Sequence, residues 1–409
     1  MKGAKKHINR IALLLVLASA VFACVEPFDL KTEDFESVLV VDAMITDELK
    51  LHEIKITRTY RLEEDGPSPE KGATVEILDD TGTLFIFAEN ELGVYVASEI
   101  FATTPGKSYQ LKITTVNGRE YSSGLEVAPQ PTQIDDINVE RGTNGQGIDG
   151  MTILVDSFDP SRNSNYYRYT YEETYKIIPP FSRADSLYSV NSSYPNCEVA
   201  FALINPFAER GSRCFGQDDS SRRIVLTSTV GLSEDRVNRF AVRFIPKTAP
   251  IIAHRYSILV NQLVISNSAF SFYETLRDFS GSESLFSQTQ PGFIEGNMMS
   301  EDNPDERVIG FFTVAAIASE RLFMDYEDVF TEGDNPQYFF SCGAFAPPIS
   351  TTLPRPGCPL SMILQEGTLI YGGPNDNPGF DEGPHNMVQR RCGDCREFAS
   401  EEAPDFWID

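Results

Sequence analysis

The chain has 409 residues, of which 41% are hydrophobic and 11% aromatic, enough to build the cores of two or three globular domains. This composition excludes an intrinsically disordered chain. Acidic residues outnumber basic ones by 60 to 34, for a formal net charge of −26, and so acidic a chain lacks the basic patch that nucleic acids and anionic lipid surfaces require.

The first 24 residues have the layout of a lipoprotein signal. Four basic residues precede an apolar run, 11–22, that is too short to span a bilayer, and Ala23 and Cys24 close it. We expect residues 1–23 to be removed and Cys24 to carry acyl chains that hold the protein on a membrane. Residues 24–36 then form an acidic tether. Its acidic residues resemble the signal for export to the outer face in Bacteroidota lipoproteins, and a plain solvated linker is the alternative.

Residues 37–128 contain short, alternating apolar segments separated by turn residues, such as the hairpin signal Asn117-Gly118. Regularly spaced short strands predict a β-sandwich. The succession of segments resembles the immunoglobulin-like and carboxypeptidase-regulatory-like modules of bacterial surface proteins, which are mostly spacers and contact surfaces. The segments that carry this resemblance are residues 72–75, 93–95 and 105–109.

A stiff Pro linker, residues 129–133, marks the expected boundary to a larger β-rich domain, residues 134–409. Residues 179–219 are polar and predict a long loop excursion from that domain. One helix is expected, Asn267 to Phe279, because its apolar residues recur at helical spacing. Residues 340–409 are rich in Pro and Gly and hold four cysteines, so we expect disulfides to fix their shape, with the apolar end around Trp407 docked on the domain. Strands are predicted around residues 134–139, 151–158, 166–178, 224–229, 240–245, 256–265 and 308–318.

The strand at residues 166–178 is unusually rich in tyrosine. Aromatic faces can stack on sugars, so these residues are candidate ligand contacts, while cross-strand packing is the favoured alternative. The candidates are Tyr166, Tyr167, Tyr169, Tyr171 and Tyr175.

Seven cysteines are present, and with Cys24 assigned to the lipid an even number remains, which predicts a disulfide framework in an exported protein. We expect Cys197 to pair with Cys214, because the two bracket a polar loop, and three pairings are open for the other four. Cys392 and Cys395 also have the spacing of a redox motif or half a zinc site, and both alternatives stay open. The candidate disulfide cysteines are Cys197, Cys214, Cys342, Cys358, Cys392 and Cys395.

No catalytic constellation is evident. His52, His254 and His385 lie in separate regions, without a partner at metal or triad spacing. We therefore expect no enzyme, no catalytic residues, no cofactor and no metal site, with two exceptions kept as minor alternatives. Paired carboxylates would allow a surface hydrolase, and the acidic loop at residues 375–382 could bind Ca²⁺ through oxygen ligands.

A set of motifs in the second domain carries a family resemblance. The chain resembles, over essentially its whole mature length, the Bacteroidota outer-membrane lipoprotein family catalogued as domain of unknown function 4249. Members are commonly encoded beside TonB-dependent receptors of the starch-uptake type, so the resemblance implies a surface lipoprotein that cooperates with a β-barrel transporter. It supplies no ligand and no catalytic residues. The motifs are Phe158-Asp159-Pro160 ahead of residues 166–175, residues 229–236, 244–246, 255–260, 272–273, 291–292, 296–297 and 308–312, and Cys392 and Cys395 ahead of residues 404–407.

From this sequence we expect a mainly β, non-enzymatic protein, anchored by lipid in the outer membrane and exposed on the cell surface. Its partner would be a TonB-dependent β-barrel receptor, which it would help to capture a ligand. The alternative is a structural subunit of an outer-membrane complex with no small-molecule ligand. A deep pocket or an aromatic groove near the strand at residues 166–175 favours capture, whereas a flat, apolar contact face favours the structural role.

Overall fold

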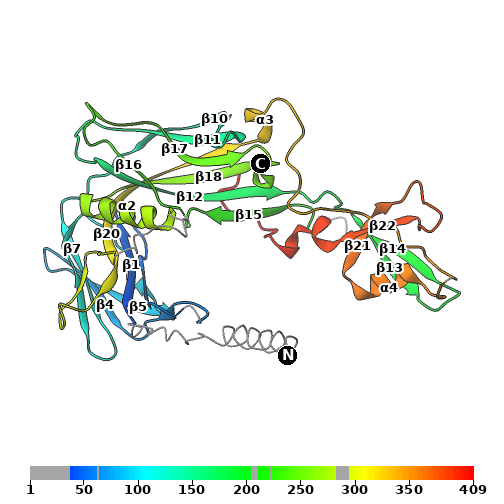
Figure 1. The fold of residues 1–409 in the computed structure, drawn as a ribbon, viewed down its shortest axis with the longest axis horizontal. Helices are drawn as coiled ribbons and strands as arrows, with labels where there is room; N and C mark the ends of the chain where they lie inside the picture. The colour runs from blue at the N-terminus through cyan, green and yellow to red at the C-terminus, as the bar shows by residue number, and fades with distance from the viewer. Residues whose placement is uncertain (1–36, 62–63, 204–210, 222, 282–293, 353) are drawn as a thin grey trace, which may run out of the picture.

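The computed structural model describes residues 37–61, 64–203, 211–221, 223–281, 294–352 and 354–409. The predicted signal peptide, Cys24 and the tether lie outside these residues. The described chain is mainly β, as predicted, and Figure 1 shows three parts: a central sandwich, an N-terminal unit below one end of it, and a small distal module at the other end of the long axis.

The N-terminal unit is one continuous sheet curled around one core. Buried side chains from both ends of the sheet, among them Leu39, Tyr121 and Met298, belong to a single apolar cluster. The Asn297 side chain completes the curl, because it accepts a hydrogen bond from the Phe312 amide at 2.7 Å and donates to the Phe312 carbonyl at 2.9 Å. The strands are β1 (Leu39–Thr46), β2 (Glu53–Arg58), β3 (Ser68–Pro69), β4 (Thr74–Asp79), β5 (Leu84–Glu91), β6 (Val94–Ala97), β7 (Ser108–Thr114), β8 (Glu120–Ser123), β9 (Glu126–Val127), β19 (Met298–Ser300) and part of β20 (Val308–Met324).

The long strand β20 belongs to two parts of the molecule. Its first half, from Val308 to Ala315, pairs in parallel with β1, and its second half, from Ala316 to Met324, pairs antiparallel with β18. Strand β19 likewise adds to β8. The N-terminal unit is therefore built from residues 37–128 together with later strands, which the expected boundary at residues 129–133 leaves out.

The central sandwich has two sheets with their apolar faces together. One sheet is three-stranded, and the other is the remainder of the large sheet that contains β20. Apolar residues from both sheets form one core, for example Ile153 and Tyr169. The strands are β10 (Ile134–Thr143), β11 (Asp149–Asp159) and β17 (Asp235–Pro246) in the first sheet, and β12 (Tyr166–Ile177), β15 (Cys214–Asp219), β16 (Val225–Ser228) and β18 (Tyr256–Val264) beside β20 in the second.

Helix α2 (Asn267–Gly281) covers the outer face of the large sheet where it leaves the N-terminal unit (Figure 1). The predicted helix is confirmed, and its apolar face is the reason it forms there: Ala269 and Tyr273 are buried against Leu263 and Phe311. Two short helical turns, η1 (Pro250–Ile252) and α3 (Tyr326–Val329), lie at the opposite end of the sandwich.

The distal module joins the predicted excursion at residues 179–219 to the C-terminal segment at residues 340–409. Neither could bury a core alone, but together they enclose Leu187, Leu360 and Met387. Its elements are β13 (Asp185–Asn191), β14 (Glu198–Leu203), α4 (Pro359–Glu366), β21 (Leu369–Pro374), β22 (His385–Gln389), η2 (Arg390–Cys392) and η3 (Cys395–Glu397).

Two disulfides connect these two segments, a third lies within the C-terminal segment, and the expected Cys197–Cys214 pair is wrong. Cys197 bonds Cys358, Cys214 bonds Cys395, and Cys342 bonds Cys392. The two cysteines of the Cys392–Cys395 pair therefore belong to different disulfides, which contradicts the zinc and redox alternatives. Cys197 and Cys214 are drawn apart because one ends in the distal module and the other on strand β15.

The C-terminal end docks on the sandwich, as expected. The Trp407 ring contacts Phe215 with centroids 4.9 Å apart and Phe323 at 5.9 Å. Asp409 accepts hydrogen bonds from Lys176 at 2.9 Å and from Arg213 at 3.1 Å.

A buried ion pair joins the two sheets of the sandwich. Arg243 on β17 donates to both oxygens of Glu173 on β12 at 3.0 and 3.1 Å, and the Tyr256 hydroxyl donates to the same carboxylate. Arg243→Met leaves the carboxylate buried without its counter-charge, so we expect a loss of about 3 kcal/mol in the free energy of unfolding, measured by urea denaturation. Adding Glu173→Gln should restore part of that loss. A single variant as stable as the parent would contradict this.

Glu126 gives a pH-dependent prediction. Burial raises the pKa of this carboxyl, although Ser266, Ser268 and Asn297 all donate hydrogen bonds to it. An acid whose pKa is higher in the folded state than in the unfolded state stabilises the fold below its unfolded pKa and loses that contribution as the pH rises through the folded value. Glu126→Gln should therefore gain stability relative to the parent over the pH range above 4.5, the ordinary pKa of a glutamate side chain. Thermal unfolding across this range checks it, with the exposed Glu53→Gln as control.

Candidate ligand-binding cavity and exposed surfaces

An open cavity of about 860 Å³ lies at the edge of the large sheet, beside the middle of β12 and the last residues of β15. Ligand pockets usually fall between about 300 and 1,000 Å³, so a monosaccharide or a larger ligand has room. The cavity is lined mainly by polar side chains from five parts of the chain: residues 171–174 of β12, residues 217–219 of β15, Ser221 and Arg223 after it, Arg243 of β17, and Phe406 near the C-terminus.

Strand pairing explains why charges gather here. In the antiparallel register of β12 and β15, Glu172 lies opposite Asp219 and Glu173 opposite Asp218. Side chains alternate between the faces of a sheet, so one carboxylate of each strand points to either side of the edge. The lining therefore includes four carboxylates and two guanidinium groups, Arg223 and Arg243, of which the buried Glu173 carboxylate is already paired with Arg243.

One wall of the cavity is aromatic. The guanidinium of Arg321 lies over the Phe406 ring, 3.5 Å from its centroid, and fixes the ring in place, while the ring stays 37% exposed. An aromatic wall beside carboxylates suits a polyhydroxylated or cationic ligand, since carboxylates accept hydrogen bonds from hydroxyl and ammonium groups. Sequence reasoning missed these residues, because they meet only through strand pairing and the docked C-terminus.

The tyrosine-rich strand is a packing element and not a sugar platform. Tyr167, Tyr169 and Tyr171 are at most 2% exposed and lie in the sandwich core. Tyr166 packs on Phe270 of helix α2. Tyr175 stacks on Phe339 with centroids 5.7 Å apart. The proposed ligand contacts are corrected accordingly, and of the five tyrosines only Tyr171 is among the residues that line the cavity.

The three histidines stay apart, as the sequence suggested. Burial is the largest cause that lowers the pKa of His52, to about 4, and its Nε2 lies 3.0 Å from the Phe101 carbonyl oxygen. Burial also lowers the pKa of His254 and of His385, whose ring lies against Phe201 and Tyr371. All three rings therefore tend to stay neutral.

In the part of the chain that the structure describes, no group of three or more His, Cys, Asp or Glu residues could hold a metal ion. The acidic loop at residues 375–382 is the β21–β22 connection. Its Glu382 carboxylate accepts hydrogen bonds from the Gly379 amide at 2.9 Å and from Asn375 at 3.2 Å, so the carboxylate serves to close the turn.

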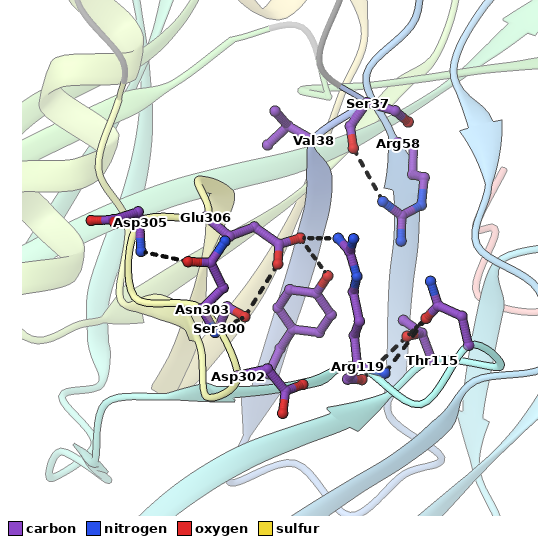
Figure 2. Close-up of polar contacts among 12 residues, drawn as sticks. Ser37, Val38, Arg58, Thr115, Arg119, Ser300, Asp302, Asn303, Asp305 and Glu306 are labelled. Atoms are coloured by element: carbon purple, nitrogen blue, oxygen red, sulfur yellow. Dashed lines mark hydrogen bonds and ion pairs between the residues drawn. The ribbon is translucent and has the colours of Figure 1, made fainter.

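A second acidic turn, residues 300–306, is bound to the N-terminal unit (Figure 2). One oxygen of Glu306 accepts from Arg119 at 2.9 Å and from the Tyr121 hydroxyl at 2.7 Å, and the other accepts from Ser300. Asp302 accepts from the Glu120 amide at 2.8 Å. These carboxylates are thus engaged in attaching the turn between β19 and β20 to strand β8.

The distal module carries an exposed apolar surface. The Phe380 ring, in the β21–β22 loop, is fully exposed, and six further large apolar side chains there are between 43% and 56% exposed. Clusters of exposed aromatic residues mark contact sites more often than isolated ones do. Together with Phe380 we call this set the distal apolar surface: Tyr188, Val190, Tyr194, Phe201, Phe345 and Met362.

Comparison with known proteins establishes the family of this chain. Among the described residues, no helix is long and apolar enough to cross a membrane. No curated protein matches the sequence. A solved structure of a DUF4785 family protein from Legionella pneumophila is 9% identical, covering 56% of this chain and 53% of that one, with a TM-score of 0.18. The family model described as "Domain of unknown function (DUF4249)" matches residues 25–321, and the chain belongs to that family.

Proposed function

We propose that this protein is a non-enzymatic lipoprotein of the outer membrane, anchored through Cys24 and exposed on the cell surface, that captures a ligand for a TonB-dependent β-barrel transporter. The observation that carries the proposal is the open cavity of about 860 Å³ beside strands β12 and β15. Capture requires such a cavity, whereas a purely structural subunit does not.

The surface location is supported by the signal sequence and by the cysteines. All six cysteines of the described residues form disulfides, which persist in exported proteins and are rare in the cytosol. The acidic composition, with 60 acidic residues, suits solubility at a crowded cell surface.

The structural role stays as a second candidate, because one observation favours it. Seven large apolar side chains are exposed on the distal module, and disulfides constrain the module, which lowers the entropy lost on contact. In this case the protein binds a partner through the distal module and no small molecule through the cavity.

The anchor is tested with Cys24→Ala. This variant lacks the thiol that accepts the lipid, so we expect it to leave the membrane fraction and appear in the soluble fraction, measured by fractionation and by incorporation of labelled palmitate. Val25→Ala, beside it, is the matched control and should stay on the membrane. Retention of the Cys24→Ala variant on membranes would overturn the anchor.

Purification of the tagged protein from native outer membranes tests the partner. We expect a β-barrel transporter to co-purify, and its absence would defeat the proposal. The double variant Glu172→Gln/Asp218→Asn should keep the transporter, because it changes only the cavity. Phe380→Ser with Tyr188→Ser should lose the transporter if the distal apolar surface is the contact.

The same variants separate capture from a structural role. In calorimetric titrations against a panel of neutral oligosaccharides, capture predicts that at least one sugar binds and that the cavity variant weakens its affinity about tenfold, since charge-assisted hydrogen bonds are lost. The Phe380 variant should bind the same sugar unchanged. Binding that is equal in all variants would exclude the cavity as the site.

A further inference from the structure

A second cavity, of about 390 Å³, lies on the distal module and differs from the first in charge. Its lining includes Arg183 at the start of β13, Tyr371 of β21, and Arg390 and Arg396 from the turns η2 and η3. We call it the arginine cavity. It shares no lining residue with the larger cavity beside β12 and β15.

The arginine cavity concentrates basic residues in an acidic chain. Three guanidinium groups and two carboxylates, Asp185 and Asp394, line it, whereas acidic residues outnumber basic ones by 60 to 34 in the whole chain. Glu397, which is not among the lining residues, pairs with Arg390 at 3.0 Å, so each of the three guanidinium groups has one carboxylate partner. The larger cavity has four carboxylates and two guanidinium groups in its lining. Overall composition therefore does not explain the local density of arginine.

The two carboxylates orient the arginines without consuming all their donors. Asp185 accepts from Nε and Nη2 of Arg183 at 2.8 and 3.4 Å, and Asp394 accepts from Nε and Nη2 of Arg396 at 2.8 and 2.5 Å. Glu397 accepts only from Nε of Arg390, at 3.0 Å. Within the described residues, no hydrogen bond reaches Nη1 of Arg183 or Arg396, or either Nη of Arg390, so N–H donors remain for a ligand.

The cavity is held in shape before any ligand arrives. Two disulfides, Cys342–Cys392 and Cys214–Cys395, anchor the segment from Arg390 to Arg396, since Cys392 and Cys395 both lie within it. A Cβ on Gly393 in that segment would lie 2.6 Å from the Ile370 side chain and 2.9 Å from the Phe181 carbonyl, so the segment packs closely on its neighbours. Preorganisation of this kind reduces the entropy lost on binding.

Arg183 is fixed a second time by an aromatic ring. Its guanidinium lies 5.1 Å from the centroid of the Tyr371 ring, which also contacts Phe201 and His385. A guanidinium that is stacked on one side and paired at one edge presents its remaining edge in a fixed direction. This geometry suits a planar or tetrahedral anion, which accepts two N–H groups at once.

We propose that the arginine cavity binds the anionic group, carboxylate or phosphate, of a small organic acid about the size of a monosaccharide. The volume of about 390 Å³ admits such a molecule, and the guanidinium N–H groups that no carboxylate accepts supply its hydrogen bonds. The site is separate from the larger cavity beside β12 and holds whether or not that cavity captures a ligand.

Calorimetric titration of the full, disulfide-bonded chain tests the site, with glucuronate, glucose 6-phosphate and neutral glucose as probes. We expect at least one of the two anions to bind and glucose not to bind at this site. Binding should weaken as salt rises, because screening reduces charge attraction. A preference for glucuronate identifies a carboxylate ligand, and one for glucose 6-phosphate a phosphate ligand. If neither anion binds, the proposal is overturned.

Arg390→Gln is the decisive variant, and Arg391→Gln is its matched control. Arg391 is the next residue and carries the same charge, but it is not among the lining residues and packs over Phe340, 4.2 Å from the ring centroid. We expect Arg390→Gln to weaken anion binding at least tenfold, the loss of one charge-assisted hydrogen bond, and Arg391→Gln to leave it within twofold. Equal losses in both variants would show general charge attraction and overturn the site.

Arg396→Gln provides a second measurement if Arg390→Gln folds poorly, since Arg396 lies on the other side of Gly393. Circular dichroism and titration of free thiols confirm that each variant keeps its fold and its disulfides. Anion binding that survives in both cavity variants would contradict the proposal.

Discussion

Strand β20 is the constraint on which the rest of the structure depends. Two different neighbours pair with its two halves, β1 in parallel and β18 antiparallel, so a single extended backbone fixes how the N-terminal unit meets the sandwich. The backbones of β20 and β1 lie too close together to admit a side chain at Gly310. A Cβ there would lie 1.9 Å from the Val41 carbonyl oxygen, and Gly310 has a φ of 121°. Neither part could therefore rotate against the other without breaking β20 ladder hydrogen bonds. Strands β18, β12 and β15 continue the same sheet, so the cavity at its edge is also held in a fixed position relative to β20.

Local pattern predicted most of the elements and little of their assembly. Alternating apolar residues located the main strands of the N-terminal unit and most of those of the sandwich, and helical spacing located α2, because the period of burial is a local property. Strands β13, β14, β15, β21 and β22 were missed, since they lie in polar or Pro- and Gly-rich segments that were predicted as loops. The boundary at residues 129–133 was placed by the prolines. What the prolines cannot reveal is that Val308 and Phe312, nearly two hundred residues later, return to complete the first core. Pairing between distant strands depends on how the side chains of the two strands fit together, and the sequence of one strand alone does not show this.

The candidate sites were harder to predict, for the same reason. The tyrosines of β12 drew attention because they cluster in sequence, yet alternation puts Tyr167, Tyr169 and Tyr171 on the buried face. The cysteines were correctly expected to form disulfides, but proximity in sequence misled the pairing of Cys197 with Cys214, since loop closure over long separations is only slightly less favourable. The charged cavities gather residues from several segments each, so no window of sequence contains them.

The disulfides also determine where the residues of the distal module lie. The distal module has a small core of four buried residues, too few to fix its position by packing alone, and the disulfides supply what that core lacks. Two of them close the segment that bears Arg390 and Arg396, and the third secures α4 against the β13–β14 turn. The same covalent frame thus holds the arginines at one site and the aromatic rings of the distal apolar surface at another. The module lies at one end of the long axis, remote from the N-terminal unit, so its position depends on these disulfides more than on packing against the rest of the chain (Figure 1).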